Sequence, residues 1–78
     1  MVDLEIIERH LALNQSHIDQ ASRHISKQHL IIEQLEEVGI STRVARDLLE
    51  TFEANFATHK QERARLLEER ELARRGTA

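Results

Sequence analysis

The chain has 78 residues, of which 40% are hydrophobic and 32% charged, and its formal net charge is −3. A chain this short forms one domain at most and buries little core by itself. The mixed charge argues against a dedicated nucleic-acid binder, which needs a basic face, and the lack of cysteine excludes disulfides and thiolate zinc sites. No apolar run approaches the length of a membrane span, so we expect a cytoplasmic protein with no membrane partner.

The first half of the chain has the pattern of one long helix over residues 3–38. Asp3 is the expected N-cap, and positions at alternating spacings of three and four then form a seam. The seam residues are Leu4, Ile7, Leu11, Asn14, Ile18, Ala21, Ile25, Gln28, Ile32 and Leu35. A repeat of this kind is the a/d seam of a coiled coil or a bundle helix. Two seam residues, Asn14 and Gln28, are polar, so the apolar stripe is thin in the middle of the helix.

A hinge is expected at residues 38–42. Gly39 is the only glycine before position 76, and the chain contains no proline. Glycine suits the left-handed residue that ends a helix, and Ile40 can then fold back onto Leu35 as in a Schellman motif. Ser41 or Thr42 is the expected cap of the next helix.

The second helix is expected over residues 42–75, with Gly76 as its C-terminal cap. Its apolar stripe is strongest between Val44 and Phe56, and beyond Phe56 charged residues dominate. Acids end the first helix and bases begin the second, so each group opposes its own helix dipole but suits the other helix. These residues are Glu33, Glu36, Glu37, Arg43 and Arg46. Their placement favours an antiparallel hairpin over one continuous rod.

An antiparallel hairpin closed at Gly39 pairs residues that lie at similar distances from the turn. The expected neighbours are Leu48 with Ile32, Phe52 with Gln28, and Leu66 with Leu13 and Asn14. Two helices share only one line of contact, which is too little to offset the entropy of ordering the chain. We therefore predict an all-α fold, a single hairpin domain of residues 1–78 that dimerises into a four-helix bundle. The expected assembly surface consists of Leu30, Ile31, Leu49, Phe52 and Phe56.

Five histidines are the unusual feature of the composition. His10, His17 and His24 repeat every seven residues, about 10.5 Å apart along the helix axis, so no two of them can share a metal ion. In the hairpin, His59 is expected near His17 and His24, which makes a metal site of these three histidines a candidate. We favour instead a hydrogen-bonded polar layer that fixes register and oligomeric state. Its expected members are His24, Gln28, Asn55 and His59. A pH switch through these histidines is a further alternative.

Nothing in the sequence favours an enzyme. Serine, histidine and aspartate occur, but no glycine-rich loop or elbow is present to hold a nucleophile. We therefore expect no catalytic residues, no cofactor and no nucleic-acid partner. The predicted function is that of a non-enzymatic, self-associating protein–protein interaction module with a possible further protein partner. The alternative is a metal- or small-ligand-binding helical bundle that uses the histidine-containing polar layer, and a catalytic role for the same histidines is a third hypothesis.

About half of the chain also resembles a known group of sequences. The residues that carry the resemblance are His24, Ile25, Gln28, Ile31, Ile32, Leu35, Gly39, Thr42, Ala45, Leu48, Leu49, Phe52, Glu53, His59, Arg63 and Leu66. As a set they resemble small uncharacterised proteins of proteobacteria, mostly α-proteobacteria. The resemblance implies a two-helix hairpin and no particular activity, cofactor or partner, because none is assigned to that group. His10 and His17 lie outside the shared positions.

Overall fold

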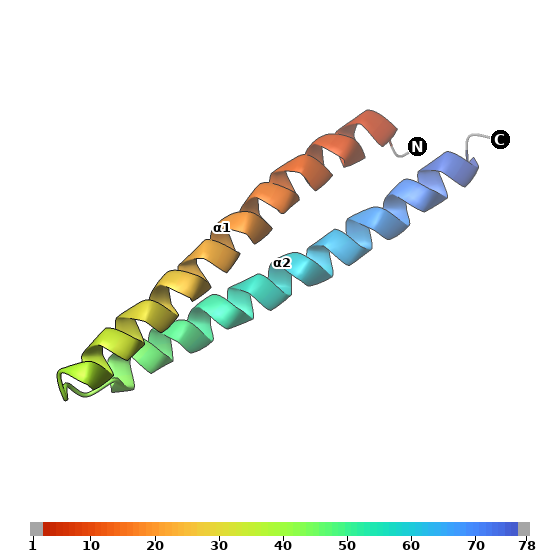
Figure 1. Ribbon diagram of the computed structural model, residues 1–78. Helices are drawn as coiled ribbons and strands as arrows, with labels where there is room; N and C mark the ends of the chain where they lie inside the picture. Colours follow the sequence, from red (N-terminus) through yellow and green to blue (C-terminus); the bar gives the residue numbers. More distant parts are fainter. Residues whose placement is uncertain (1–2, 77–78) are drawn as a thin grey trace.

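Two antiparallel α-helices make up the computed structural model, which describes residues 3–76 (Figure 1). Helix α1 spans Leu4–Glu37 and helix α2 spans Arg43–Gly76, each with 34 residues. The expected all-α hairpin is confirmed, and each helix end lies within one residue of its expected position. The terminal residues 1, 2, 77 and 78 of the expected domain lie outside the described part.

The start of α1 and the turn after it have the caps that the sequence predicts. Asp3 Oδ1 accepts a 2.9 Å hydrogen bond from the backbone N–H of Glu5. Gly39 has a φ of 72°, in the left-handed region that favours glycine. The backbone N–H groups of Gly39 and Ile40 donate to the carbonyl oxygens of Glu36 and Leu35 at 3.1 and 2.9 Å. These two bonds are those of the Schellman motif, which confirms the expected end of α1.

The start of α2 uses both candidate caps in different ways. Ser41 Oγ accepts a 3.4 Å hydrogen bond from the backbone N–H of Arg43. The carbonyl oxygen of Thr42 accepts from the backbone N–H of Arg46 at 2.8 Å, whereas its hydroxyl accepts from Nε of the Arg46 side chain at 2.9 Å. The Thr42 side chain therefore orients Arg46 instead of capping a free backbone N–H group.

Ion pairs join the two helices near both ends of the hairpin. Arg46 Nη2 lies 2.7 Å from Glu36 Oε1 across the turn, as the charge pattern predicts. At the open end, the Glu8 carboxylate lies 3.6 Å from Arg70 and 3.9 Å from Arg74. Both residues of the Glu36–Arg46 pair are more than half exposed, so the pair contributes at most about 1 kcal/mol to stability.

The core is a thin line of side chains between the helices. The buried residues of α1 are all members of the predicted seam: Ile7, Leu11, Asn14, Ala21, Gln28 and Ile32. Leu66 is the buried residue of α2, and it forms an apolar cluster with Ile7 and Leu11 near the open end. The 3.5-residue repeat therefore identified the contact line correctly.

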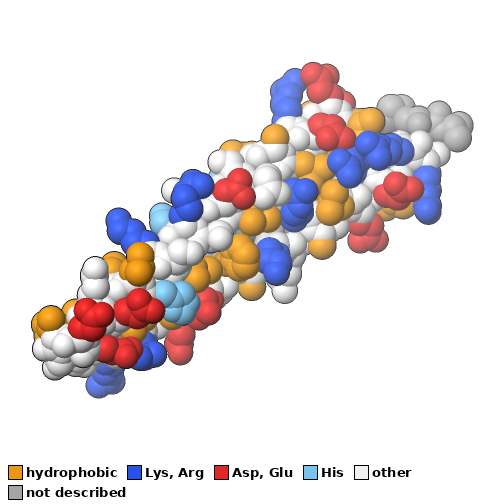
Figure 2. Space-filling model, viewed as in Figure 1, with side chains coloured by type: hydrophobic (Ala, Val, Ile, Leu, Met, Phe, Trp, Pro, Cys, Tyr) orange, Lys and Arg blue, Asp and Glu red, His pale blue; other side chains and the backbone are white. Residues whose placement is uncertain are grey.

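The hairpin is a rod with a large surface for its mass. Its principal extents are 63 × 14 × 12 Å and its radius of gyration is 17.8 Å, whereas a compact chain of this length has a radius of gyration of about 11.5 Å. Apolar side chains are visible at the surface between charged ones (Figure 2). Neither described helix has an apolar stretch long enough to cross a membrane.

Candidate functional site

Two buried side-chain amides in α1 hold the register of the helices. Gln28 Nε2 donates a 2.9 Å hydrogen bond to the carbonyl oxygen of Ala45, and Asn14 Nδ2 donates one of 2.9 Å to the carbonyl oxygen of His59. Only 5% of Gln28 and 4% of Asn14 is exposed. Both bonds run from a seam position of α1 to the backbone of α2, so sliding one helix along the other would break them.

The side-chain amide of Asn14 has one polar atom without a hydrogen bond. Its Oδ1 atom is buried and has no hydrogen-bond partner among residues 3–76. A buried acceptor left without a partner costs about 1–3 kcal/mol. Such a cost at a polar seam position is a feature that calls for a functional explanation.

The observed register places Phe52 beside His24. The centroids of these two rings lie 5.3 Å apart with an interplanar angle of 42°. Gln28, the residue that the sequence placed opposite Phe52, lies about one turn further along α1 than His24, and its amide bonds to the carbonyl oxygen of Ala45.

A shallow groove runs along one side of the hairpin. Its central part is lined by His17, Gln20, Ala21, His24, Phe52, Asn55 and His59. It continues toward the open end as a second depression lined by His10, Leu13, Asn14, His17, His59, Glu62 and Leu66. We call these two depressions together the histidine groove. Three histidines of α1 and one of α2 therefore line the same side of the molecule.

The four residues of the predicted polar layer do not share one buried layer. His24, Asn55 and His59 line the central part of the groove, but His24 and Asn55 are exposed and His59 is half-buried. Gln28 is buried closer to the turn and bonds to Ala45. The buried polar residues are instead Asn14 and Gln28, which lie on the seam itself, whereas His24 and Asn55 lie one position beside it.

The three histidines considered for a metal site, His17, His24 and His59, do not all contact one another. The rings of His17 and His59 lie 5.2 Å apart between centroids, while His24 packs against Phe52. Within residues 3–76, no three or more His, Asp or Glu side chains are grouped so that they could hold a metal ion. The structure thus brings two of the three candidates together.

The two long sides of the hairpin differ in chemistry. With the seam at heptad positions a and d, positions c and g lie on the groove side and positions b and e on the other. Six of the exposed large apolar residues occupy c or g: Ile6, Leu13, Val38, Val44, Leu48 and Leu72. Four of the five residues in the ion pairs between the helices occupy e: Glu8, Glu36, Arg46 and Arg74; the fifth, Arg70, lies on the seam. The groove side is therefore rich in unburied apolar surface, and the opposite side is charged.

The residues expected to form the assembly surface are distributed around the hairpin. Leu49, Phe52 and Phe56 are half-buried near the seam, and the Lys60 ammonium lies 5.2 Å from the centre of the Phe56 ring. Ile31, also half-buried, falls at a g position on the groove side. Leu30 is 58% exposed and lies on the side of α1 that faces away from α2.

One carboxylate in the groove has a perturbed pKa. Arg65 donates from Nε to Glu62 Oε2 at 3.1 Å and also bonds the other oxygen of Glu62 and a carboxylate oxygen of Glu69. The hydrogen bond from Arg65 is the main cause that lowers the pKa of Glu62, with smaller contributions from the charges of Arg65 and His10. Glu62 is thus an ionised partner of Arg65, a poor candidate for a general base near neutral pH.

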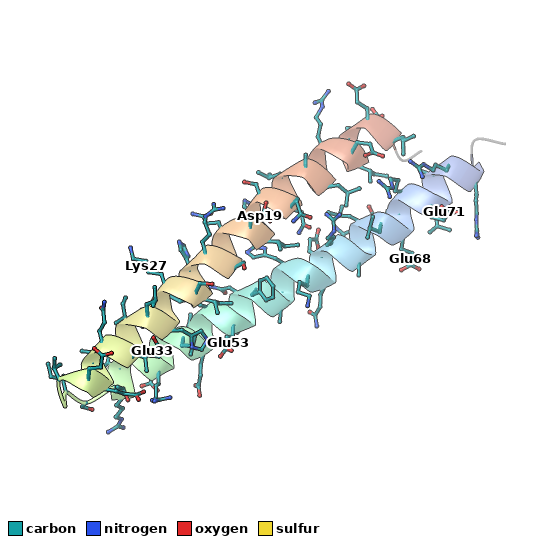
Figure 3. The ribbon with its side chains drawn as sticks, in the orientation of Figure 1. Asp19, Lys27, Glu33, Glu53, Glu68 and Glu71 are labelled. Atoms are coloured by element: carbon teal, nitrogen blue, oxygen red, sulfur yellow. The ribbon has the colours of Figure 1, made fainter. Side chains whose placement is uncertain are left out.

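The remaining charges lie on the outside of the rod. The side chains of Asp19, Lys27, Glu33, Glu53, Glu68 and Glu71 are all exposed (Figure 3). Among residues 3–76, no charged side chain is buried.

Comparison with known proteins gives no match. No protein-family model matches the chain, and no curated protein and no solved structure is significantly similar to it. The function of the chain is therefore inferred from the geometry of the hairpin.

Proposed function

We propose that the protein is a non-enzymatic interaction module that self-associates, with two hairpins pairing into a four-helix bundle. The observation that carries this proposal is the surface area. The described hairpin exposes 6019 Å², whereas a compact monomer of this mass exposes about 4,900 Å². The excess is comparable to the roughly 800 Å² that each partner buries in a standard interface.

The groove side is the surface that best suits a second copy. It carries Leu13 near the open end and Val38 and Leu48 near the turn, all with large exposed fractions. The opposite side carries charges such as Glu36 and Arg46 that are already paired within one hairpin. Burying those pairs against another chain would cost desolvation free energy, whereas burying the apolar residues is favourable.

A two-fold axis across the middle of the rod gives a consistent arrangement. In such a dimer the same patch of each subunit meets its own copy. The apolar residues near the turn of one hairpin then pack on those near the open end of the other. The polar middle of the groove, with His17, His24 and His59, meets the same segment of the second copy, so polar groups face polar groups.

The mass in solution tests this proposal. Sedimentation equilibrium or light scattering on the untagged chain at micromolar concentration should give twice the chain mass of 9.1 kDa. The midpoint of thermal unfolding should also rise with protein concentration, because association stabilises only the folded chain. A folded monomer with a concentration-independent midpoint would refute the proposal.

A metal- or small-ligand-binding bundle is the second candidate function. The contact between His17 and His59 in the groove favours it. Both rings belong to one chain, so a single hairpin already presents this contact in its groove.

A further inference from the structure

We propose that His17 and His59 bind one divalent transition-metal ion, which joins the middle of α1 to the middle of α2. The two imidazole rings come from different helices and their centroids lie 5.2 Å apart at an angle of 42°. Two histidines on one tetrahedral ion, with metal–nitrogen bonds of about 2.1 Å, place their ring centres about 5 Å apart. The observed spacing therefore suits a shared ion.

The surroundings leave the remaining coordination positions open. The pair lies where the two depressions of the histidine groove meet, since both residues line both depressions. His24 is engaged with Phe52 and Glu62 with Arg65, so the protein supplies two ligands and water supplies the others. A site with two protein ligands and bound water is an exchangeable site, unlike a closed structural zinc site with four protein ligands.

A second and independent observation points to the same place. Asn14 lines the groove beside the pair and donates to the carbonyl oxygen of His59, and its Oδ1 atom is a buried acceptor with no partner among residues 3–76. Asn14 is therefore a positioning residue, because its amide holds the backbone segment that carries His59.

The donor set indicates the class of metal. Imidazole nitrogens suit Cu²⁺, Ni²⁺ and Zn²⁺, whereas Mg²⁺ and Ca²⁺ prefer oxygen ligands. Among ions of the imidazole-binding class the affinity should be greatest for Cu²⁺. Because the two ligands are adjacent only in the folded hairpin, binding stabilises the fold, and this stabilisation grows with the logarithm of the free metal concentration. Both ligands come from one chain, so the two-histidine pair is present in a single hairpin.

Calorimetry and thermal unfolding of the untagged chain test the proposal with CuCl₂, ZnCl₂ and MgCl₂. We expect saturable binding of one Cu²⁺ per chain and weaker binding of Zn²⁺, each with a rise in the unfolding midpoint, and no effect of MgCl₂. His17→Ala and His59→Ala should each lower the affinity at least tenfold and abolish the rise. His29→Ala is the matched control, because His29 is exposed and lies outside the groove, and it should leave both quantities unchanged.

Two further measurements keep the test decisive. If His59→Ala fails to fold, the exposed His17 still provides the test, and the spectrum of bound Cu²⁺ should show two coordinating imidazole nitrogens in the parent chain and one in His17→Ala. Asn14→Leu should weaken binding without lowering the stability of the metal-free chain. Equal affinity in the parent, His17→Ala and His29→Ala would show adventitious binding and overturn the proposal, as would the absence of saturable binding in the parent.

Discussion

Asn14 of α1 donates a 2.9 Å hydrogen bond to the backbone carbonyl oxygen of His59 in α2, although its own Oδ1 atom is buried without a partner among residues 3–76. Gln28 makes the corresponding hydrogen bond to the carbonyl oxygen of Ala45. The side-chain oxygen of Gln28 is not a buried acceptor without a partner. Asn14 and Gln28 are therefore two comparable seam residues, but only the Asn14 side chain has a buried polar atom without a hydrogen bond among residues 3–76.

Replacing each amide by leucine should reveal this difference. Asn14→Leu loses one hydrogen bond but also removes the unsatisfied oxygen, so we expect the free energy of unfolding to rise by about 1 kcal/mol. Gln28→Leu removes a hydrogen bond without removing an unpaired acceptor, and it should change the free energy of unfolding by less than about 1 kcal/mol in either direction. Urea denaturation of the metal-free proteins measures both. A loss of stability in Asn14→Leu larger than that in Gln28→Leu would show that Asn14 Oδ1 is satisfied in solution.

Gly39→Ala should destabilise the hairpin. Gly39 has a φ of 72°, and an added Cβ would meet no atom within 4 Å. The cost is therefore the backbone strain of a left-handed alanine, about 1–2 kcal/mol. Gly76→Ala is the control, since Gly76 also has open space around it but no positive φ, and it should be neutral or slightly stabilising. An increase in stability for Gly39→Ala would mean that the two helices join into one rod in solution.

Leu66→Ala should be among the most damaging truncations of the core. Leu66 is 2% exposed and packs with Ile7 and Leu11, and truncation of such a leucine typically costs about 2–5 kcal/mol. Leu72→Ala removes the same atoms from a side chain that is 58% exposed, and it should cost less than about 1 kcal/mol in the monomer. Thermal unfolding of the two variants at low protein concentration compares them. Similar midpoints would contradict the packing described for the open end.

Leu13 and Leu30 provide a matched test of the dimer surface. They are the same residue type in the same helix and are 57% and 58% exposed, but only Leu13 lines the histidine groove. Loss of one buried leucine from an interface weakens it by about 1.5–3 kcal/mol, so Leu13→Gln should raise the dimer dissociation constant at least about tenfold. Leu30→Gln should leave the constant within about twofold. The reverse order, measured by sedimentation velocity, would place the interface on the outer face of α1.

Glu62 should contribute to acid sensitivity. Its pKa is lowered below the ordinary value of 4.5, chiefly by the hydrogen bond from Arg65. A carboxyl group with a lowered folded-state pKa adds stability above its unfolded pKa, and this stability is lost as the pH falls through the folded value. Glu62→Gln should therefore lose slightly less stability between neutral pH and pH values below 4.5 than the parent does. The effect should be small and weakened by salt, because the ion pair is solvent-exposed.

Glu53→Gln is the control for this pH dependence. Glu53 is exposed and makes no ion pair within residues 3–76 (Figure 3), so its substitution should leave the acid-induced loss close to that of the parent. Chemical denaturation at a series of pH values provides the comparison. If the two variants have the same pH profile, the Glu62–Arg65 pair makes no net contribution to stability.

The sequence by itself determined the two helices, the turn at Gly39 and the seam, because these depend on local periodicity, capping residues and backbone preferences. The sequence also predicted that Glu36 and Arg46 would meet across the turn, where they form an ion pair. Register was decided only in the tertiary structure. A heptad pattern repeats, so hairpins shifted by one turn bury similar apolar side chains, and the choice among them depends on which polar groups find partners.

The bonds from Gln28 to Ala45 and from Asn14 to His59 make that choice. They bring His17 beside His59 and His24 beside Phe52, and they leave Asn14 Oδ1 unpaired within residues 3–76. The hairpin prediction already placed His59 near His17, as observed. The hydrogen bonds of the two amides and the contact of His24 with Phe52 depend on the axial position of one helix against the other to within a single turn, and spacing along one helix does not determine that position.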